Sequence, residues 1–336
     1  MWEIMKRIPA ITLAIFAVLS AGLSSWSCSR GGYSGKVETI TFGTLPSEAA
    51  GLIYVAQDRQ FFADNGLSVV MKYYDTGVTV TDALLKGEVN IALCSEFPFL
   101  AKVLAKEKIS GVGVADRFTY FYLFGRRDRG IDGIATLKRK RVGITRGTIT
   151  DFYLGRFLEL NGMTAQDVTL VDVAPPQIVD AISSGSVDAI VAWGAFALQI
   201  RAQLGTKIIE WQVQSGQASY GVISARNDWT NSHPEIINRF LISLSQAEKY
   251  LTLQPARAKA IVQKWMNYED ASMQTIWPEH QFSLSLDQSL IAAMEDEARW
   301  MIKNNLTREK EIPDFMKFIF MDGLEAVKPE AVNIIR

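Results

Sequence analysis

The sequence has few of the residues that carry redox, metal or hydrolytic chemistry. Its 336 residues include two cysteines, Cys28 and Cys94, and two histidines, His233 and His280, each pair far apart along the chain. Neither a disulfide framework nor a zinc site is therefore indicated. No H-E-x-x-H, C-x-x-C, G-x-S-x-G or phosphate-loop pattern occurs, which counts against metalloprotease, hydrolase and kinase functions. We expect no metal and no cofactor.

An excess of charge of either sign is also absent. Lys and Arg total 35 and Asp and Glu total 36, for a formal net charge of −1, so nucleic acid is not predicted as a partner. The concentrated basic run at 138–141 precedes a short apolar run and is interpreted as a solvated turn. The composition, 48% hydrophobic and 10% aromatic, is that of a folded protein, and the length allows two domains.

Residues 1–27 are typical of an export signal. Lys6 and Arg7 precede an apolar stretch at 8–23, which is shorter than the roughly 20 residues of a membrane-spanning helix. Small residues before position 28 suit signal-peptidase cleavage, whereas Cys28 suggests lipoprotein processing, with 28–36 as a flexible tether. Trp26 departs from the usual lipoprotein pattern. We predict a protein of the periplasm or of the outer face of the cell membrane, where lipid at Cys28 would anchor it.

Strand and helix patterns alternate through most of the remaining chain. Strands are predicted at 39–43, 67–74, 89–94, 111–115, 120–125, 141–144, 169–173, 189–193, 207–211 and 220–224, with helices between most of them. From residue 234 onward the pattern is helical, at 234–252, 255–266, 270–277, 287–304 and 313–320. The order predicts an α/β fold of two lobes. Residues 37–122 start lobe 1, 123–219 form lobe 2, and 220–336 return to lobe 1 and add carboxy-terminal helices.

The stretch 142–160 is a candidate anion site. An apolar run is followed by the turn Arg146-Gly147-Thr148 and then by a helical pattern. A helix that begins after such a turn directs unpaired N–H groups and the positive end of its dipole at whatever lies above it. The guanidinium of Arg146 also suits planar oxyanions. An ordinary strand–helix connection capped by Thr148 or Thr150 explains the same pattern.

Several short motifs occur in an order that resembles one family of transport proteins. They lie at 61–67, 84–92, 137–143, 147–154, 184–189 and 233–235. Together they resemble the extracytoplasmic substrate-binding proteins of ABC importers, in the branch that carries nitrate, taurine and other sulfonates, and thiamine-pyrimidine precursors. The resemblance covers about residues 36–300.

The resemblance implies the type II periplasmic-binding clamshell. Two α/β lobes would hold a small polar ligand in the cleft between them, and the carboxy-terminal helices would pack on the first lobe. Ligands of open α/β sheets bind at the carboxyl ends of strands, which agrees with this arrangement. The resemblance also implies lobe closure by hinge bending and a permease in the membrane as partner. We expect a monomer without enzyme activity.

Matching positions imply ligand contacts from both lobes. They are Thr44, Leu45, Pro46, Ser47, Ser95, Glu96 and Phe97 in lobe 1, Arg146, Gly147, Thr148, Ile149, Gln177, Trp193 and Gly194 in lobe 2, and Tyr220 near the return crossing. Other roles stay open. Gln177 could start a helix, Trp193 could be core, and Tyr220 could pack at the hinge.

Glu96 and Arg146 stand out because their charges disagree. A carboxylate in the cleft repels nitrate or sulfonate and favours a ligand with a cationic or hydrogen-bond-donating part, although Glu96 could instead cap the next helix. Arg146 favours an anion, unless it pairs with Asp151 or Asp172. If both face the cleft, the ligand has one donor-rich and one acceptor-rich end.

Two further functions are compatible with the same fold. The same lobe closure could report to a membrane signalling partner instead of a permease. A related branch forms the thiamine pyrimidine by consuming a histidine in its cleft, but His233 and His280 both lie in the carboxy-terminal part. Cys94 falls in an apolar strand and is predicted to be buried and inert.

Overall fold

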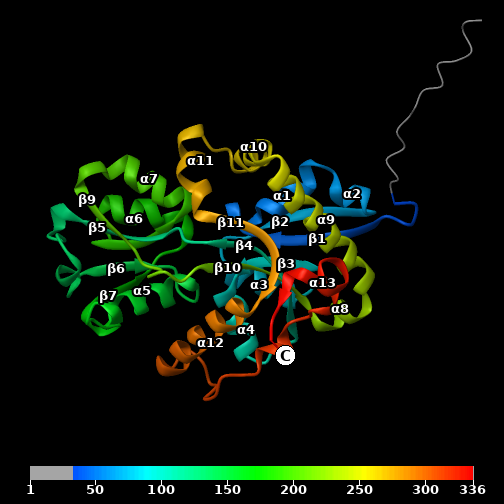
Figure 1. Ribbon diagram of the computed structural model, residues 1–336. Helices are drawn as coiled ribbons and strands as arrows, with labels where there is room; N and C mark the ends of the chain where they lie inside the picture. The colour runs from blue at the N-terminus through cyan, green and yellow to red at the C-terminus, as the bar shows by residue number, and fades with distance from the viewer. Residues whose placement is uncertain (1–32, 336) are drawn as a thin grey trace, which may run out of the picture. The chain divides into compact units, whose positions relative to one another are not determined.

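The larger sheet brings the first and last parts of the chain together. The computed structural model describes residues 33–335, so the predicted signal peptide and Cys28 lie outside the described residues. The sheet has seven strands in the order β12-β11-β4-β10-β3-β1-β2 (Figure 1). They are β1 (Glu38–Thr44), β2 (Leu67–Tyr73), β3 (Ile91–Ser95), β4 (Ile109–Phe118), β10 (Ser219–Arg226), β11 (His280–Asp287) and β12 (Val332–Asn333). β2 and β3 lie parallel to β1, whereas β10 runs antiparallel to β3 and β4.

The smaller sheet has five strands in the order β7-β6-β8-β5-β9. They are β5 (Phe121–Arg126), β6 (Arg141–Ile144), β7 (Thr169–Asp172), β8 (Ala189–Trp193) and β9 (Ile208–Gln212). β6, β7 and β8 are parallel, and β5 runs antiparallel to β8 and β9. The chain enters this sheet between β4 and β5, at 119–120, and leaves it between β9 and β10, at 213–218. The predicted lobe boundaries at 122/123 and 219/220 stay predictions.

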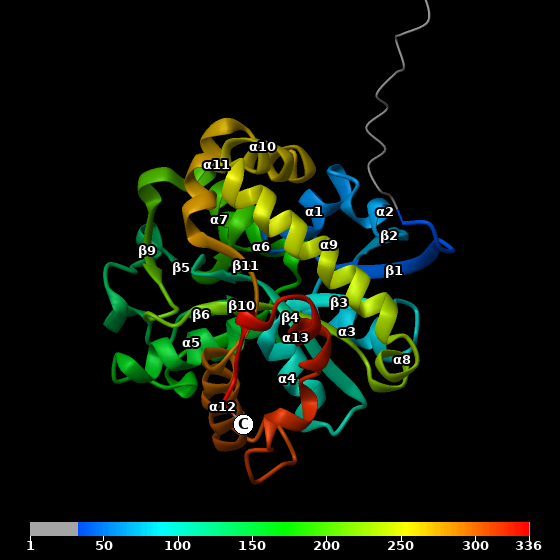
Figure 2. The same ribbon diagram turned by 45° about the vertical axis from the view of Figure 1, so that its right-hand side comes forward.

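Helices cover both sheets. In Figure 1, α6 and α7 lie on one side of the smaller sheet and α5 on the other. On the larger sheet, α9 packs against α1 and α2, and α12 packs against α4 (Figures 1 and 2). Stacked rings hold α9 in place, because Phe240 lies 5.7 Å from Phe42 of β1 and 5.3 Å from Phe62 of α2. The helices are α1 (Gly51–Asp58), α2 (Phe61–Asp64), α3 (Gly77–Leu85), α4 (Glu96–Leu104), α5 (Ile149–Leu160), α6 (Ile178–Ser184), α7 (Gly194–Leu204), α8 (Asn227–Ser232), α9 (Pro234–Leu253), α10 (Pro255–Met266), α11 (Asp270–Ile276), α12 (Gln288–Lys303) and α13 (Asp322–Val327).

The carboxy-terminal part is not wholly helical, which corrects the prediction. β11 adds a strand that pairs with β4, and β12 pairs with β11. The alternation Phe282, Leu284, Leu286 has the period of a strand, and all three side chains are buried. The predicted helix at 313–320 is one short 3₁₀ turn, Phe315–Phe318. No helix among the described residues is long and apolar enough to cross a membrane.

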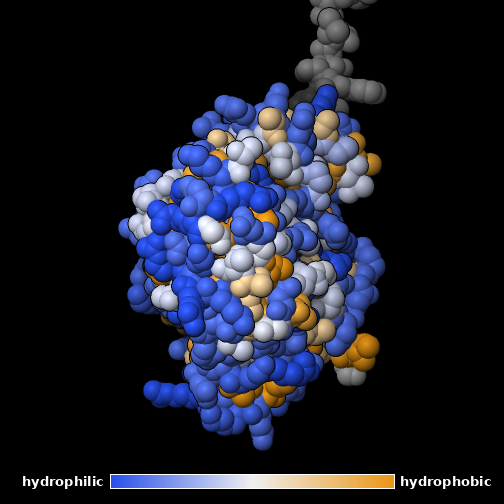
Figure 3. Space-filling view, turned by 90° about the vertical axis from the view of Figure 1, so that its left-hand side faces the viewer, coloured by the Kyte–Doolittle hydropathy of each residue, from blue (hydrophilic) through white to orange (hydrophobic). Residues whose placement is uncertain are grey.

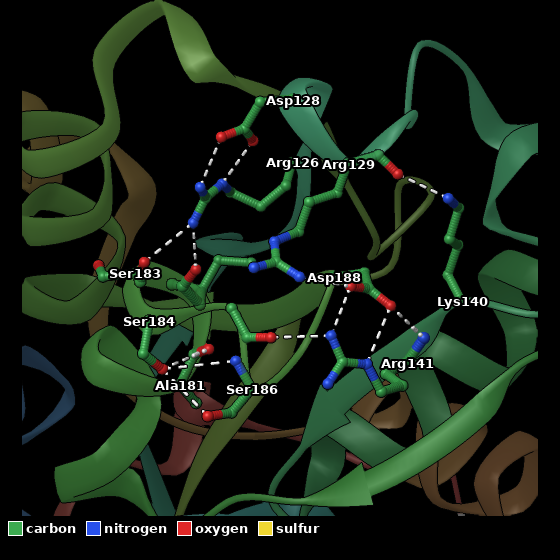
Figure 4. Close-up of polar contacts among 12 residues, drawn as sticks. Arg126, Asp128, Arg129, Lys140, Arg141, Ala181, Ser183, Ser184, Ser186 and Asp188 are labelled. Carbon is green, nitrogen blue, oxygen red and sulfur yellow. Dashed lines mark hydrogen bonds and ion pairs between the residues drawn. The ribbon is translucent and has the colours of Figure 1, made fainter.

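Basic residues between β5 and β6, including the run at 138–141, have a structural role in the smaller sheet. Hydrophilic side chains dominate the face of the molecule that carries this sheet (Figure 3). Below that surface the Arg141 guanidinium binds the Asp188 carboxylate, with Nη2 and Oδ1 at 2.7 Å, and Lys140 Nζ donates to the Arg129 carbonyl at 2.6 Å (Figure 4). Arg126 binds Asp128 and two carbonyls of α6 in the same view. These contacts join the amino ends of β6 and β8, at the edge opposite to their carboxyl ends.

Candidate functional site

A cavity that is partly open to solvent lies where strand ends of the two sheets meet. From the larger sheet come residues that follow β1, β2 and β3, and from the smaller sheet come residues that follow β6 and β8. Both sets are carboxyl ends of parallel strands, where open α/β sheets bind ligands. The lining residues are Thr44, Leu45, Ser47, Ala49, Asp75, Thr76, Gly77, Leu93, Cys94, Ser95, Pro98, Phe118, Tyr120, Phe121, Thr145, Thr148, Ile149, Thr150, Pro175 and Trp193.

The lining combines hydroxyl groups with aromatic rings and has almost no charge. Seven lining residues are Ser or Thr and four are aromatic. Asp75 is exposed at the rim, and it is the charged member among the described lining residues, which include no Lys, Arg or His. A ligand here must be held by hydrogen bonds, ring contacts and backbone dipoles, because no cationic side chain lines the cavity.

Four helices begin at the cavity, and their amino ends supply its dipoles. α3, α4, α5 and α7 start directly after the lining residues Thr76, Ser95, Thr148 and Trp193. At α5, Thr148 Oγ1 donates to the Thr145 carbonyl at 2.7 Å and accepts from the Thr150 N–H at 3.4 Å. Each helix start carries a partial positive charge of about half a unit. The α5 end, with its cluster of threonines, is therefore suited to acceptor-rich groups.

Aromatic rings form the opposite part of the cavity lining. Tyr120 lies 4.8 Å from Phe118 and 5.0 Å from Phe121, and Phe121 lies 5.7 Å from Trp193. Three of these residues sit at the first crossing between the sheets, and Trp193 ends β8. The cluster therefore joins both lobes and gives a ligand an apolar surface to contact.

Six of the predicted ligand residues lie in the cavity lining: Leu45, Ser47, Ser95, Thr148, Ile149 and Trp193. Thr44, expected beside them, is also there. The other predicted positions do not line the cavity. They are Pro46, Glu96, Phe97, Arg146, Gly147, Gln177, Gly194 and Tyr220. For the residues that line the cavity, contact with a ligand stays a prediction. For the residues that do not line it, the structure gives that prediction no support.

Glu96 is directed into the protein interior, which corrects its assignment to the cavity lining. The residue is fully buried, and Oε2 accepts from Ser219 Oγ at 2.8 Å and from the Tyr220 N–H at 2.9 Å. Burial raises the pKa of the Glu96 carboxyl to about 7. Its partners lie at the start of β10, where the chain returns from the smaller sheet. Glu96 therefore holds the crossing together and does not repel or attract ligand in the cavity.

Arg146 also departs from its expected role. Its side chain is 47% exposed, Nη1 lies 3.6 Å from Asp151 Oδ1, and its backbone N–H donates to Asp172 Oδ1 at 3.1 Å. The guanidinium lines a separate groove between α5 and α12. Gly147 has φ +72° and donates its N–H to Asp151 Oδ2 at 2.5 Å. The Asp151 carboxylate thus contacts the Arg146 guanidinium and the Gly147 N–H, the two groups that the sequence analysis assigned to an anionic ligand.

The remaining outlying positions have packing roles. The Phe97 ring stacks on Phe152 at 6.3 Å, which joins α4 to α5. Tyr220 is mostly buried beneath Arg117, whose guanidinium lies 6.0 Å from the ring centre. Pro46 and Gln177 are exposed. The alternatives of hinge packing for Tyr220 and of a helix start for Gln177 fit these positions.

Sequence reasoning missed the residues after β2 and at the first crossing. Asp75, Thr76 and Gly77 follow β2 and start α3, so the strand-end rule that found Ser95 would have found them too. Phe118, Tyr120 and Phe121 had no such signal, because a crossing between sheets is recognised only once the strand pairing is known.

Neither the thiol nor the imidazoles are placed for chemistry on a ligand. Burial raises the pKa of the Cys94 thiol to about 12, so the lining thiol is protonated. The His280 ring is buried, with Nδ1 2.5 Å from Asp116 Oδ2, and His233 stacks on Trp229 at 5.0 Å. Neither histidine lines the cavity. Within residues 33–335 no group of His, Cys, Asp and Glu forms a metal site.

Comparisons with known proteins agree with the predicted family and fold. The family model described as "NMT1/THI5 like" matches residues 48–258. The taurine-binding periplasmic protein of Escherichia coli is 25% identical over 205 residues, which cover 60% of this chain and 63% of that protein. An enzyme, the 4-amino-5-hydroxymethyl-2-methylpyrimidine phosphate synthase of Aspergillus parasiticus, is 24% identical over 223 residues, 61% of this chain and 64% of that protein.

A solved structure supports the clamshell prediction. The alkanesulfonate-binding protein SsuA from Xanthomonas axonopodis pv. citri, bound to MOPS, superposes with a TM-score of 0.74 and 15% identity. The match covers 86% of this chain and all of that one, 100%. The likeness confirms the predicted α/β clamshell fold with two sheets, and the family resemblance inferred from the ordered motifs is confirmed as well.

Proposed function

Because the chain belongs to the NMT1/THI5-like family, we propose that it is the extracytoplasmic solute-binding protein of an ABC importer. It captures a small organic ligand between its two lobes and delivers that ligand to a permease in the membrane. The proposal includes a location in the periplasm or at the outer face of the cell membrane, where Cys28 would carry a lipid, and a monomeric state.

The observation that carries this proposal is the cavity, whose lining comes from both sheets. Thr44, Ser95 and Thr76 come from the larger sheet, and Thr148 and Trp193 come from the smaller one. A ligand that contacts both sets binds better when the lobes are close together than when they are apart. Such a difference in affinity is what shifts a two-state protein toward its closed form.

The two chain crossings supply the hinge in this proposal. Gln214, in the second crossing, is buried and accepts from the Phe121 N–H at 3.0 Å. Its amide nitrogen donates to the Phe118 carbonyl at 2.9 Å, so one side chain ties the two crossings together. Short crossings that are hydrogen-bonded to each other allow bending at one place while each sheet stays intact.

We further propose that the chain catalyses no reaction, although its relatives include an enzyme. The support is the lack of an activated nucleophile or base in the lining. The Cys94 thiol there is protonated, and the described lining residues include no histidine. A sensor for a membrane signalling partner would use the same closure. Permease and ATPase genes beside this one would favour import.

The test is ligand binding without turnover. Native mass spectrometry of the purified protein should detect a small molecule, whose removal lowers the melting temperature and whose return restores it. Chromatography should recover that molecule unchanged after long incubation. A released molecule that differs from the one added would refute the proposal in favour of an enzyme, and a protein that binds no solute would refute it altogether.

A further inference from the structure

Helix α12 packs on one helix from each lobe. It follows β11 of the larger sheet, and its neighbours are α4, which follows β3 of the larger sheet, and α5, which follows β6 of the smaller one (Figures 1 and 2). α4 and α5 begin directly after the cavity-lining residues Ser95 and Thr148. None of the described lining residues belongs to α12. α12 is therefore placed to act on the ligand site through these two helices and not by contact with a ligand.

Three aromatic rings meet where the three helices meet. Phe97 of α4 lies 6.3 Å from Phe152 of α5 and 6.3 Å from Trp300 of α12. Trp300 lies edge-on to Phe152 at 5.6 Å. Gly155 of α5 permits this approach, because a Cβ at position 155 would lie 2.4 Å from Trp300 Cζ2. Stacked and edge-on ring pairs are favourable beyond the area that they bury. The ring cluster therefore holds a helix of the second lobe against two helices of the first.

Ion pairs extend the contact between α5 and α12. The Arg156 guanidinium binds the Asp296 carboxylate, and Lys303 Nζ lies 2.8 Å from Glu159 Oε1. Their side chains are between 32% and 67% exposed, so solvent weakens both pairs, and the rings are the stronger part of the contact. We call the whole contact the α12 latch, which consists of Phe152, Gly155, Arg156 and Glu159 of α5 with Asp296, Trp300 and Lys303 of α12.

Two buried donors in the latch have no hydrogen-bond partner. Trp300 Nε1 and Arg156 Nε are buried, and within residues 33–335 neither has an acceptor. A buried donor without an acceptor loses the hydrogen bonds that water would give it. Separation of α5 from α12 would return both donors to water and offset part of the lost ring contact. A contact balanced in this way can form and break, unlike the continuous core of either lobe.

We propose that the α12 latch sets the balance between closed and open arrangements of the two lobes. In the described arrangement residues of both lobes line one cavity, and the latch is formed. Rotation of the lobes about the two chain crossings would move α5 relative to α12 and break the latch. The latch therefore stabilises the closed arrangement before a ligand binds, and Trp300 is a positioning residue for the ligand site. This inference rests on the proposed binding function.

Loss of the latch has a different visible effect in each of two cases. Apparent affinity is the intrinsic affinity multiplied by the fraction of protein in the binding-competent arrangement. If the ligand-free wild type is mostly open, loss of the ring contacts should lower that fraction and the affinity about 10-fold. If the ligand-free wild type is mostly closed, loss of the latch instead expands the protein. Two measurements together cover both cases.

Trp300→Ala tests the latch by these two measurements. Small-angle X-ray scattering gives the radius of gyration of the ligand-free protein. Calorimetry gives the affinity for whichever of taurine, nitrate and 4-amino-2-methylpyrimidine the wild type binds most tightly. Trp300→Ala should raise the radius, weaken binding about 10-fold, or do both. The matched control is Trp265→Ala, because Trp265 stacks on Tyr54 at 5.0 Å within the first lobe, and it should leave both readouts unchanged.

Further variants keep the test independent of the folding of Trp300→Ala. Gly155→Ala should act in the same direction, because the added Cβ would displace the indole, while alanine suits a helix interior better than glycine. In a Trp300→Ala background Gly155→Ala should add nothing. Arg156→Glu should weaken the latch through repulsion by Asp296, and adding Asp296→Arg to Arg156→Glu should restore it.

Unchanged radius and unchanged affinity in both Trp300→Ala and Gly155→Ala would overturn the inference and leave the binding function intact. Additive effects of these two substitutions would also overturn it, because they would then not act through one contact. A wild type that binds none of the three probes and carries no co-purified solute would overturn the proposed function. The radius of Trp300→Ala would then still decide whether the latch holds the lobes together.

Discussion

The buried carboxyl pair of Glu96 and Glu297 should make the folded chain lose stability as the pH rises. Both side chains are fully buried, and they lie close enough for each carboxyl to affect the pKa of the other. Arg156, the cation near Glu297, binds Asp296. Two carboxylates in contact without a cation cannot both be ionised, so the pair retains a proton.

The direction follows from the pKa shifts. Burial raises the pKa of Glu96 from 4.5 to about 7, and burial with the adjacent Glu96 raises the pKa of Glu297 well above its usual range. The folded chain therefore binds more protons than the unfolded chain. The stabilisation is complete below the unfolded pKa of 4.5 and is lost as the pH rises through about 7 and beyond.

The magnitude follows from one retained proton. Each pH unit costs about 1.4 kcal/mol for a proton that the folded chain holds and the unfolded chain releases. Glu297→Gln replaces the protonated carboxyl with an uncharged amide of similar size that does not titrate. Between pH 6 and pH 8 the wild type should therefore lose about 2.7 kcal/mol of unfolding free energy relative to Glu297→Gln.

Urea denaturation at pH 6, 7 and 8 measures this difference directly. The matched control is Glu295→Gln on the same helix, whose carboxylate is 40% exposed and pairs with Arg299. The control should follow the wild-type pH profile, whereas Glu297→Gln should be flatter. Parallel profiles for wild type and Glu297→Gln, with equal denaturant slopes, would show that the pair holds no proton and would refute the reasoning.

Three other outcomes are expected. Arg146→Ala should change ligand affinity by less than about twofold, because the guanidinium faces Asp151 outside the cavity; a loss above tenfold in calorimetry would restore the sequence-based assignment. Cys94 should resist a thiol reagent at pH 8 until denaturant is added, since burial raises its pKa to about 12. Asp188→Asn should cost about 1–3 kcal/mol in denaturant titrations by removing the charge and one of the two oxygens that accept from Arg141, with ligand binding unchanged. Hydrogen bonding from Arg141 lowers the pKa of Asp188 to about 2, so this stabilisation should be present above pH 4 and fade as the pH falls toward 2.

The sequence could predict the order of strands and helices because apolar residues recur at different spacings in the two kinds of element. Buried parallel strands such as β3 and β8 appear as short apolar runs bounded by glycine or polar residues, and their existence was predicted from that pattern. β11 was missed because a long helical region surrounds it and its alternation spans few residues. Strand order and the crossing residues depend on long-range pairing, which a local pattern does not encode.

The sequence predicted which loops form the site, but it did not predict which residues of each loop line the cavity. Residues that follow a strand were placed at the cavity edge, as Ser47, Ser95 and Thr148 show. Which residue of a loop faces the ligand depends on how the following helix is rotated about its own axis. One residue separates Ser95, in the lining, from Glu96, in the interior. Neighbours at a helix start point about 100° apart, so a one-residue difference exchanges a ligand contact for a core contact.

The disagreement between Arg146 and Glu96 disappears once both are located. Neither side chain lines the cavity, so neither charge constrains the ligand directly. The groups that do line the cavity include hydroxyls at helix starts in both lobes, with Ser95 before α4 in the first lobe and Thr148 before α5 in the second. A ligand contacts both sets at once only when the lobes are closed.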